Sequence, residues 1–231
     1  MRNHRFRDVY EVAARFRLYT LFRCYFQQVV FPGKDLVEQA VRQIMSSGET
    51  SKELQEGANL LLACADYPAD EMMFEYNALF VGPGKLLAPP YESSYRNPEK
   101  TLMQQETLAV RSFYSRAGLQ CGALNSIPDD HLALELEFIC YLLARAGKYL
   151  EQRNPEAAEL FLELYREFFM EHAASWIPEH CQDVLKCAQT PLCKGMAMVM
   201  LGFIRQEEQL LNELGSELLE PEKDIFKTNI S

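Results

Sequence analysis

The chain has 231 residues, of which 48% are hydrophobic, so it can bury one sizeable core and is not disordered throughout. Its formal net charge of −10 argues against general nucleic-acid binding, which relies on a basic face. No apolar run approaches the roughly 20 residues that cross a bilayer, and no uninterrupted apolar segment follows the arginines near the N-terminus. We therefore expect a cytoplasmic protein without a secretory signal or an integral membrane segment.

Helical periodicity dominates the first part of the chain. Aromatic and apolar residues recur three and four positions apart from Phe6 to about Phe31, as they do on one face of a helix, and Pro32–Gly33 ends this pattern. The same reading predicts helices over 34–45, 51–65 and 68–80. Strand signals are weak everywhere, so the sequence favours an all-helical fold.

A proline- and glycine-rich loop follows over residues 82–99. It carries Gly82, Pro83, Gly84, Pro89, Pro90 and Pro98, which do not fit regular helix interiors. A connection of this length inside a compact domain is usually functional or disordered. Its leucines and tyrosines favour order, because disordered linkers are poor in such residues.

Helical patterns resume after this loop. A helix is predicted over 100–117 with Gly118 as its C-cap, and a second loop over 120–128 ends at Asp129–Asp130, either of which can cap a helix over 131–152. Further helices are expected over 155–173, 175–188 and 192–214. The sequence thus predicts an all-α, single-domain bundle of about eight or nine helices over 1–214, followed by an acidic, flexible tail over 215–231.

The two ends of the chain differ in charge. Residues 1–23 hold six arginines against two acids, and residues 207–224 hold seven acids against one lysine. We interpret both as solvated ends that can also be neighbours in space.

The seven cysteines are dispersed and odd in number, which is typical of reduced, mostly buried thiols in a cytosolic protein. The cluster of Cys181, Cys187 and Cys193, with His172 and His180 nearby, fits no metal-binding spacing and is interpreted as thiols. Common zinc, di-iron and hydrolase motifs are absent from the sequence. Gly82-Pro83-Gly84-Lys85 lacks the spacing and the hydroxyl residue of a phosphate loop.

Two segments carry the information about function. The first runs from Glu75 to Pro83 and continues as Pro89-Pro90-Tyr91-Glu92-Ser93-Ser94-Tyr95. Its helical part places aromatic and apolar side chains on one face, and its loop presents tyrosines with polar tips on a semi-rigid backbone. This combination is suited to contact with a peptide.

The second segment is Pro128-Asp129-Asp130-His131, continued by a helix that carries Glu135 and Phe138. His131 and Glu135 are four positions apart and share a helix face. The flanking carboxylates are expected to favour the charged form of the histidine. This group could act as a general base or form a capping and hydrogen-bond network, and the spacing favours the network.

Three motifs together resemble the TorD/DmsD/NarJ family of molybdoenzyme-maturation chaperones. They are Glu-Tyr-x-x-Leu-Phe-x-Gly-Pro from position 75, Pro-Pro-Tyr-Glu-Ser-x-Tyr from 89, and Pro-Asp-Asp-His-x-x-x-Glu-Leu-Glu-Phe from 128. A looser resemblance covers most of the chain. It implies an all-helical protein that binds the twin-arginine signal peptide, and often the body, of an oxidoreductase that receives a molybdopterin cofactor.

The resemblance also implies a peptide groove and no catalytic or metal-binding residue. One side of this groove would hold Tyr76, Leu79, Phe80, Pro90, Tyr91, Glu92 and Ser93. The other would hold Asp129, Asp130, His131, Glu135 and Phe138. Family members have been linked to guanine nucleotides and to the molybdenum cofactor, for which this sequence shows no pocket.

The residue types agree with this reading, because a basic pair followed by an apolar stretch calls for carboxylates beside an aromatic groove. Two alternatives stay open at this point. One is a helical interaction or regulatory module with another partner. The other is a metal-dependent hydrolase that uses Asp129, Asp130 and His131.

Overall fold

The computed structural model describes residues 8–27, 34–46, 50–64, 69–97, 105–119 and 127–219. The regular secondary structure in these ranges is helical, apart from an isolated antiparallel bridge between Tyr91 and His131. The helices are α2 (Val9–Phe26), α3 (Lys34–Ser46), α4 (Lys52–Ala63), α5 (Ala69–Phe80), α6 (Ser93–Arg96), α7 (Gln105–Arg116), α8 (Leu132–Glu151), α9 (Pro155–Phe168), the short π-helix η2 (Phe169–Ala173), α10 (Ala174–Cys187) and α11 (Pro191–Leu219). The predicted all-α fold is confirmed.

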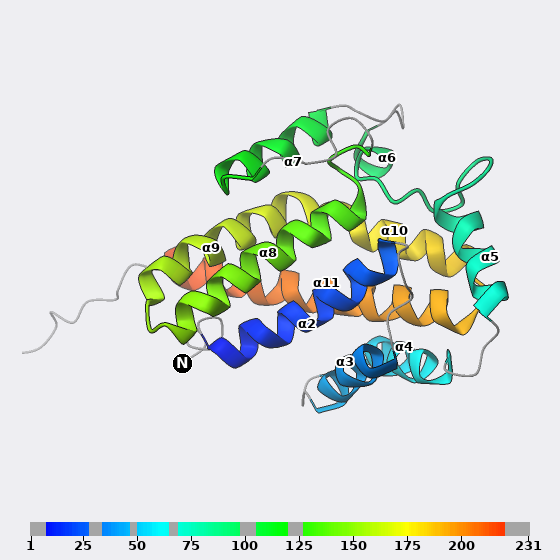
Figure 1. Ribbon diagram of the computed structural model, residues 1–231, viewed down its shortest axis with the longest axis horizontal. Coiled ribbons are helices and arrows are strands. Elements are labelled where there is room, and N and C mark those ends of the chain that lie inside the picture. The colour runs from blue at the N-terminus through cyan, green and yellow to red at the C-terminus, as the bar shows by residue number, and fades with distance from the viewer. Residues whose placement is uncertain are drawn as a thin grey trace, which may run out of the picture.

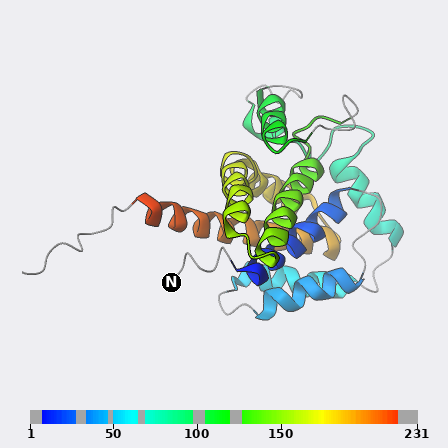
Figure 2. The same ribbon diagram turned by 60° about the vertical axis from the view of Figure 1, so that its left-hand side comes forward.

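Helices α2, α8, α9, α10 and α11 form the centre of the molecule (Figure 1). Helix α2 packs along α8, α8 along α9, and α10 along α11. The α3–α4 pair covers α11 on one side, whereas α7 lies on the opposite side, and the turned view shows the same order (Figure 2). Large side chains that are fully buried fill the space between these helices, among them Tyr19, Phe22, Tyr165, Phe168 and Trp176.

Side-chain caps explain where several helices begin. The Asp8 carboxylate accepts a hydrogen bond from the Tyr10 amide, and Ser51 caps α4 in the same way through the Leu54 amide. Asn154 caps α9, in which Pro155 takes the first-turn position that tolerates proline. Gly118 follows α7 with a φ of 72°, so the predicted glycine C-cap is confirmed.

Several predicted boundaries differ from the structure. Helix α2 ends at Phe26, short of its predicted end near 31. The loop predicted over 82–99 contains the one-turn helix α6, which is too short to show a periodic pattern. The two helices predicted over 155–173 and 175–188 are continuous through η2, and Pro178 lies inside α10. Pro191 begins α11, and α11 continues to Leu219, beyond its predicted end at 214.

Pro178 lies in the second turn of α10 and has no N–H to donate to the carbonyl four residues earlier. The π-helix over 169–173 ends just before that carbonyl. The chain start up to residue 7, most of the 120–128 loop and the tail from 220 lie outside the described residues, as do the predictions made for them.

The oppositely charged ends meet inside the protein. The guanidinium of Arg15 on α2 lies 2.7 Å from the carboxylate of Glu207 on α11, and the Tyr165 hydroxyl donates to the same carboxylate at 2.8 Å. Both charged residues are buried. The predicted proximity is therefore confirmed for this pair, whereas its predicted solvation is wrong.

The described cysteines form no disulfide, but only half of them are buried, which is fewer than expected. The six cysteines in the described ranges are free, and Cys140, Cys181 and Cys193 are buried. Those ranges contain no group of three or more His, Cys, Asp or Glu side chains placed to hold a metal ion. Within the same ranges, no helix has the length and apolarity that a membrane span requires.

Candidate functional site: a buried carboxylate cluster

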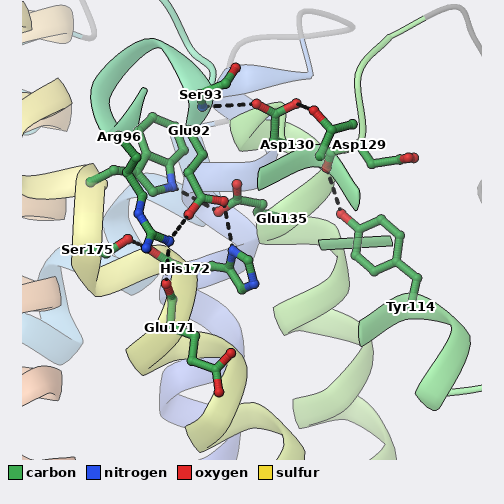
Figure 3. Close-up of polar contacts among 12 residues, drawn as sticks. Glu92, Ser93, Arg96, Tyr114, Asp129, Asp130, Glu135, Glu171, His172 and Ser175 are labelled. Atoms are coloured by element: carbon green, nitrogen blue, oxygen red, sulfur yellow. Dashed lines mark hydrogen bonds and ion pairs between the residues drawn. The ribbon is translucent and has the colours of Figure 1, made fainter. Parts of the chain in front are cut away.

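The two informative sequence segments lie against each other. The Leu132 amide donates to the Pro90 carbonyl at 2.9 Å, and the Glu92 amide donates to the Asp130 carbonyl at 3.0 Å. Together with the bridge between Tyr91 and His131, these bonds fix the proline-rich loop on the start of α8. Four carboxylates from the two segments are thereby gathered in one buried carboxylate cluster, defined by Glu92, Asp129, Asp130 and Glu135 (Figure 3).

Asp130 holds three elements together. Its Oδ2 accepts a hydrogen bond from the Ser93 amide at 3.0 Å, and its Oδ1 accepts one from the Thr107 hydroxyl at 2.8 Å. Ser93 begins α6, Thr107 belongs to α7, and Asp130 lies two residues before the start of α8. Because the side chain is fully buried, each of these bonds replaces water that the carboxylate has lost.

Asp129 is held by an arginine. Arg111 of α7 places both Nε and Nη2 2.6 Å from Asp129 Oδ2. The Tyr114 hydroxyl donates to the Asp129 backbone carbonyl at 3.1 Å (Figure 3). Asp129 is buried, and Arg111 reaches it from the surface.

Glu92 lies between two positively charged or chargeable groups. Its Oε1 accepts a hydrogen bond from Arg96 Nη1 at 2.6 Å, and its Oε2 lies 2.7 Å from His172 Nδ1. Arg96 Nη1 also donates to the Glu171 carbonyl at 2.9 Å, and this hydrogen bond connects α6 to the π-helix η2. The π-helix thus presents both the His172 side chain and the Glu171 carbonyl to the cluster (Figure 3).

Glu135 differs from the other three carboxylates. Burial, together with the nearby Glu92 charge, raises its pKa well above the usual range. The Trp176 indole donates to its Oε2 at 3.1 Å. Among the described residues, Glu135 Oε1 has no hydrogen-bond partner, and neither do two neighbouring buried atoms, Ser93 Oγ and His172 Nε2.

His131 is a capping residue. Its Nδ1 accepts a hydrogen bond from the Ala133 amide at 3.1 Å, so His131, and not Asp129 or Asp130, is the N-cap of α8. Burial lowers the pKa of His131 to about 4, against the opposing effect of Asp130. The predicted charged histidine is therefore wrong, because loss of water outweighs the attraction of the carboxylate.

These contacts do not favour the alternative of a metal-dependent hydrolase that uses Asp129, Asp130 and His131. Both oxygens of Asp130 accept hydrogen bonds from protein donors, Asp129 is paired with Arg111, and the Nδ1 of His131 caps a helix. All three side chains therefore have structural partners, as the network interpretation predicted.

The predicted apolar residues lie in two other places. Tyr76, Leu79 and Phe80 are buried, and the two aromatic rings pack in a cluster with Tyr25 and Phe26. Phe138 is buried elsewhere, where its ring contacts those of Tyr114 and Phe168. Phe138 therefore lies beside partners of the cluster, because Tyr114 also bonds the Asp129 carbonyl and Phe168 stacks on His172.

Of the twelve predicted site residues, ten are buried, and only Tyr91 and His131 are partly exposed. The two exposed rings are in edge-to-face contact, with their centroids 5.0 Å apart. Whether these twelve residues bind a peptide stays a prediction.

Several partners of the cluster were missed from the sequence. They are Arg96, Thr107, Arg111, His172 and, as an indole donor, Trp176. Arg96 could have been found, because it lies four residues from Glu92 on a short helix. The others come from distant elements, and no spacing in the sequence pairs them with a carboxylate.

Glu75, the first residue of the first motif, also has a structural role. Its carboxylate accepts hydrogen bonds from the Gln189 and Thr190 amides and from the Thr190 hydroxyl, just before α11. Burial acts to raise the pKa of Glu75, but these hydrogen bonds outweigh it and lower the pKa. The motif thus fixes α5 to the start of α11.

The two signature segments thus meet in one buried carboxylate cluster within an all-helical fold. Residues 47–182, more than half of the chain, match the family model of the nitrate reductase delta subunit. The chain belongs to this family, and the resemblance to the TorD/DmsD/NarJ chaperones is confirmed.

Named relatives agree with this assignment. The "Probable Tat proofreading chaperone DmsD" of Haemophilus influenzae is 26% identical over 132 residues, which cover 57% of this chain and 58% of the relative. The "Chaperone protein TorD" of Vibrio cholerae is 26% identical over 147 residues, or 64% of this chain and 65% of the relative. A "Chaperone protein TorD" of Vibrio vulnificus is 29% identical over 112 residues, or 48% and 51%. The chain thus spans less than two thirds of the length of these relatives.

Proposed function

We propose that this chain is a cytoplasmic chaperone that binds the twin-arginine signal peptide, and the body, of a molybdopterin-dependent oxidoreductase during cofactor insertion and before export. The observation that carries the proposal is the buried carboxylate cluster, in which both family segments meet. Relatives named Tat proofreading chaperone and TorD chaperone support it.

The surface around the cluster fits such a peptide. An arginine pair needs carboxylates for its charge and hydrogen bonds, and an apolar stretch needs exposed apolar side chains nearby. Tyr91 and His131 lie at the exposed edge of the cluster. Leu87 in the same loop and Ile127 just before Pro128 are 51% and 43% exposed, which leaves apolar area for the rest of the peptide.

This arrangement supports binding rather than catalysis. The Asp129, Asp130 and His131 side chains are engaged in structural contacts, and the neutral imidazole at position 131 offers an aromatic face and a ring nitrogen to a ligand. We therefore propose no chemical step for this protein and no cofactor of its own.

Calorimetric titration of the purified protein with twin-arginine signal peptides of molybdoenzymes tests the proposal. We expect saturable binding at micromolar or lower concentration to at least one peptide, and weaker binding of its twin-lysine version, because lysine cannot form the paired hydrogen bonds of a guanidinium. Failure of every twin-arginine peptide to bind would contradict the proposal.

Variants locate the binding site. His131→Ala and Glu92→Gln should each weaken binding about tenfold, because each removes a contact group from the cluster or its edge. Asp183→Ala, which removes a partly exposed carboxylate on α10 paired with Lys186, is the control. If His131→Ala and Glu92→Gln keep the parent's helicity by circular dichroism and its affinity, the site lies elsewhere.

A further inference from the structure

Two of the cluster's carboxylates already hold guanidinium groups of this chain. Glu92 is paired with Arg96, and Asp129 is paired with Arg111, in each case with an N–O distance of 2.6 Å. The two acidic side chains are 0% and 3% exposed, whereas the two arginine side chains are 41% and 45% exposed. The carboxylates are therefore fixed inside the protein, and their partners reach them from the surface.

This pairing constrains how a ligand can use the cluster. Glu92 has one oxygen on Arg96 and the other on His172, and the paired oxygen of Asp129 faces two nitrogens of Arg111. An arginine from a peptide cannot pair with either acid in the same way while the internal arginine stays in place. Removing the internal arginine alone would leave a buried charge unpaired, which is costly, but exchanging one guanidinium for another keeps the charges balanced.

A second observation indicates that the buried carboxylate cluster can accept a further hydrogen-bond donor. Glu135 Oε1 is fully buried and has no hydrogen-bond partner among the described residues. Arg96 directs the same nitrogen, Nη1, to Glu92 and to the Glu171 carbonyl. A guanidinium has five N–H groups, so one that enters more deeply can serve Glu92 and the unpartnered oxygen of Glu135 together.

We propose that Arg96 and Arg111 are internal occupants of two guanidinium sites, and that the arginine pair of the client peptide takes their place on Glu92 and Asp129. This inference rests on the proposed function and adds its mechanism. The internal arginines keep the cluster neutralised when no client is bound, and they make any client without guanidinium groups a poor competitor. Glu92 and Asp129 can then be paired in the free protein and still become partners of a peptide.

The test compares Arg96→Gln and Arg111→Gln with Arg205→Gln in titrations with one twin-arginine peptide. Arg205 is a half-exposed arginine on α11 that pairs with Glu53 at 3.2 Å, so its replacement changes the net charge equally but leaves the cluster intact. We expect the two cluster variants to bind the peptide about tenfold more tightly than the Arg205 variant, because the internal competitor is gone.

The outcomes separate the two proposals. If the parent binds the peptide and neither cluster variant binds more tightly than the control, the exchange is wrong and the proposed function stands. If none of the four proteins binds the peptide, the proposed function fails, and the exchange fails with it. If only the cluster variants bind, the exchange is supported directly.

A second measurement covers the case in which a variant is unstable. Methylguanidinium at low millimolar concentration should raise the melting temperature of Arg96→Ala and Arg111→Ala, because it fills the vacated site. It should leave that of Arg205→Ala unchanged, since Glu53 is partly exposed and keeps its water. Equal responses of all three variants would overturn the proposed guanidinium sites.

Discussion

At the scale of single residues, the cluster shows how a protein buries four carboxylates next to one another. Asp130 is satisfied by a backbone amide and a hydroxyl, and Asp129 and Glu92 by guanidinium groups. Burial and the neighbouring Glu92 raise the pKa of Glu135, which favours its protonated form. Hydrogen-bond donors, counter-charge and a raised pKa each reduce the cost of burying these acids.

The histidine at the edge of the cluster gives the protein a predictable response to pH. The folded protein keeps His131 neutral down to about pH 4, its lowered pKa, whereas the unfolded chain binds that proton near the ordinary value of about 6.5. Between these values the unfolded state holds more protons, so stability falls as the pH is lowered.

His131→Asn should remove this contribution and keep the cap, because asparagine is a favourable N-cap residue. We expect the parent to lose about 1–2 kcal/mol more stability than the variant between pH 7 and pH 5. Urea denaturation at both pH values measures this difference. The raised pKa of Glu135 acts in the opposite direction but is common to both proteins. Equal losses in the two proteins would show that His131 titrates normally.

The sequence identified the acids of the cluster but not their partners. Glu92, Asp129, Asp130 and Glu135 stand in motifs, so a resemblance can select them. Arg111 is 18 positions from Asp129, and His172 is 80 positions from Glu92. These partners reach the carboxylates only because α7 and the π-helix η2 pack on the cluster, and no spacing in the sequence predicts that packing.

At the scale of elements, the long helices were predictable because their periodicity and caps agree. The errors fall where neither signal exists. Helix α6 is a single turn inside a proline-rich loop, and η2 is a register change that leaves the apolar pattern nearly intact. Both of these elements touch the buried carboxylate cluster, so the site depends on the parts of the fold that were hardest to predict.

Glycines set how closely α4 and α11 approach. A Cβ at Gly57 would lie 2.9 Å from the Val199 amide nitrogen and 2.8 Å from Met198 Cβ. A Cβ at Gly147 on α8 would meet only Val12 Cγ1, at 3.7 Å. The first position has no room for a methyl group, and the second has ordinary van der Waals space.

Gly57→Ala should therefore lower the free energy of unfolding by about 2 kcal/mol, in spite of the better helix propensity of alanine. Gly147→Ala should raise it by up to about 1 kcal/mol, because there the propensity acts alone. Thermal denaturation of both variants beside the parent makes the comparison. A stabilised Gly57→Ala protein would mean that α4 does not pack on α11 through this contact.

At the scale of the whole molecule, a buried ion pair in the described part of the chain links the two oppositely charged ends. Arg15 on α2 and Glu207 on α11 meet beside Tyr165, whose hydroxyl also contacts that of Tyr19 at 3.1 Å. The sequence indicated that these ends could be neighbours, from charge alone. It could not indicate burial, because the same pattern of charges is equally compatible with a solvated surface.

Breaking this pair should destabilise the whole fold. Glu207→Ala leaves the buried Arg15 without this carboxylate and should cost about 3–5 kcal/mol in urea denaturation. The double replacement of Arg15 by Met and Glu207 by Leu should recover most of that loss, because it removes both charges. A single variant that loses less than about 1 kcal/mol would show that water reaches the pair.

Hydrogen–deuterium exchange of the whole 231-residue chain, with and without a twin-arginine signal peptide, shows directly whether the peptide lies on the cluster. We expect slower exchange in the peptide complex over residues 88–97 and 127–135, which carry the cluster and its exposed edge. We expect little change along α3 and α4 on the far side of the molecule. Protection confined to those distant helices, with none at the cluster, would contradict this placement of the peptide.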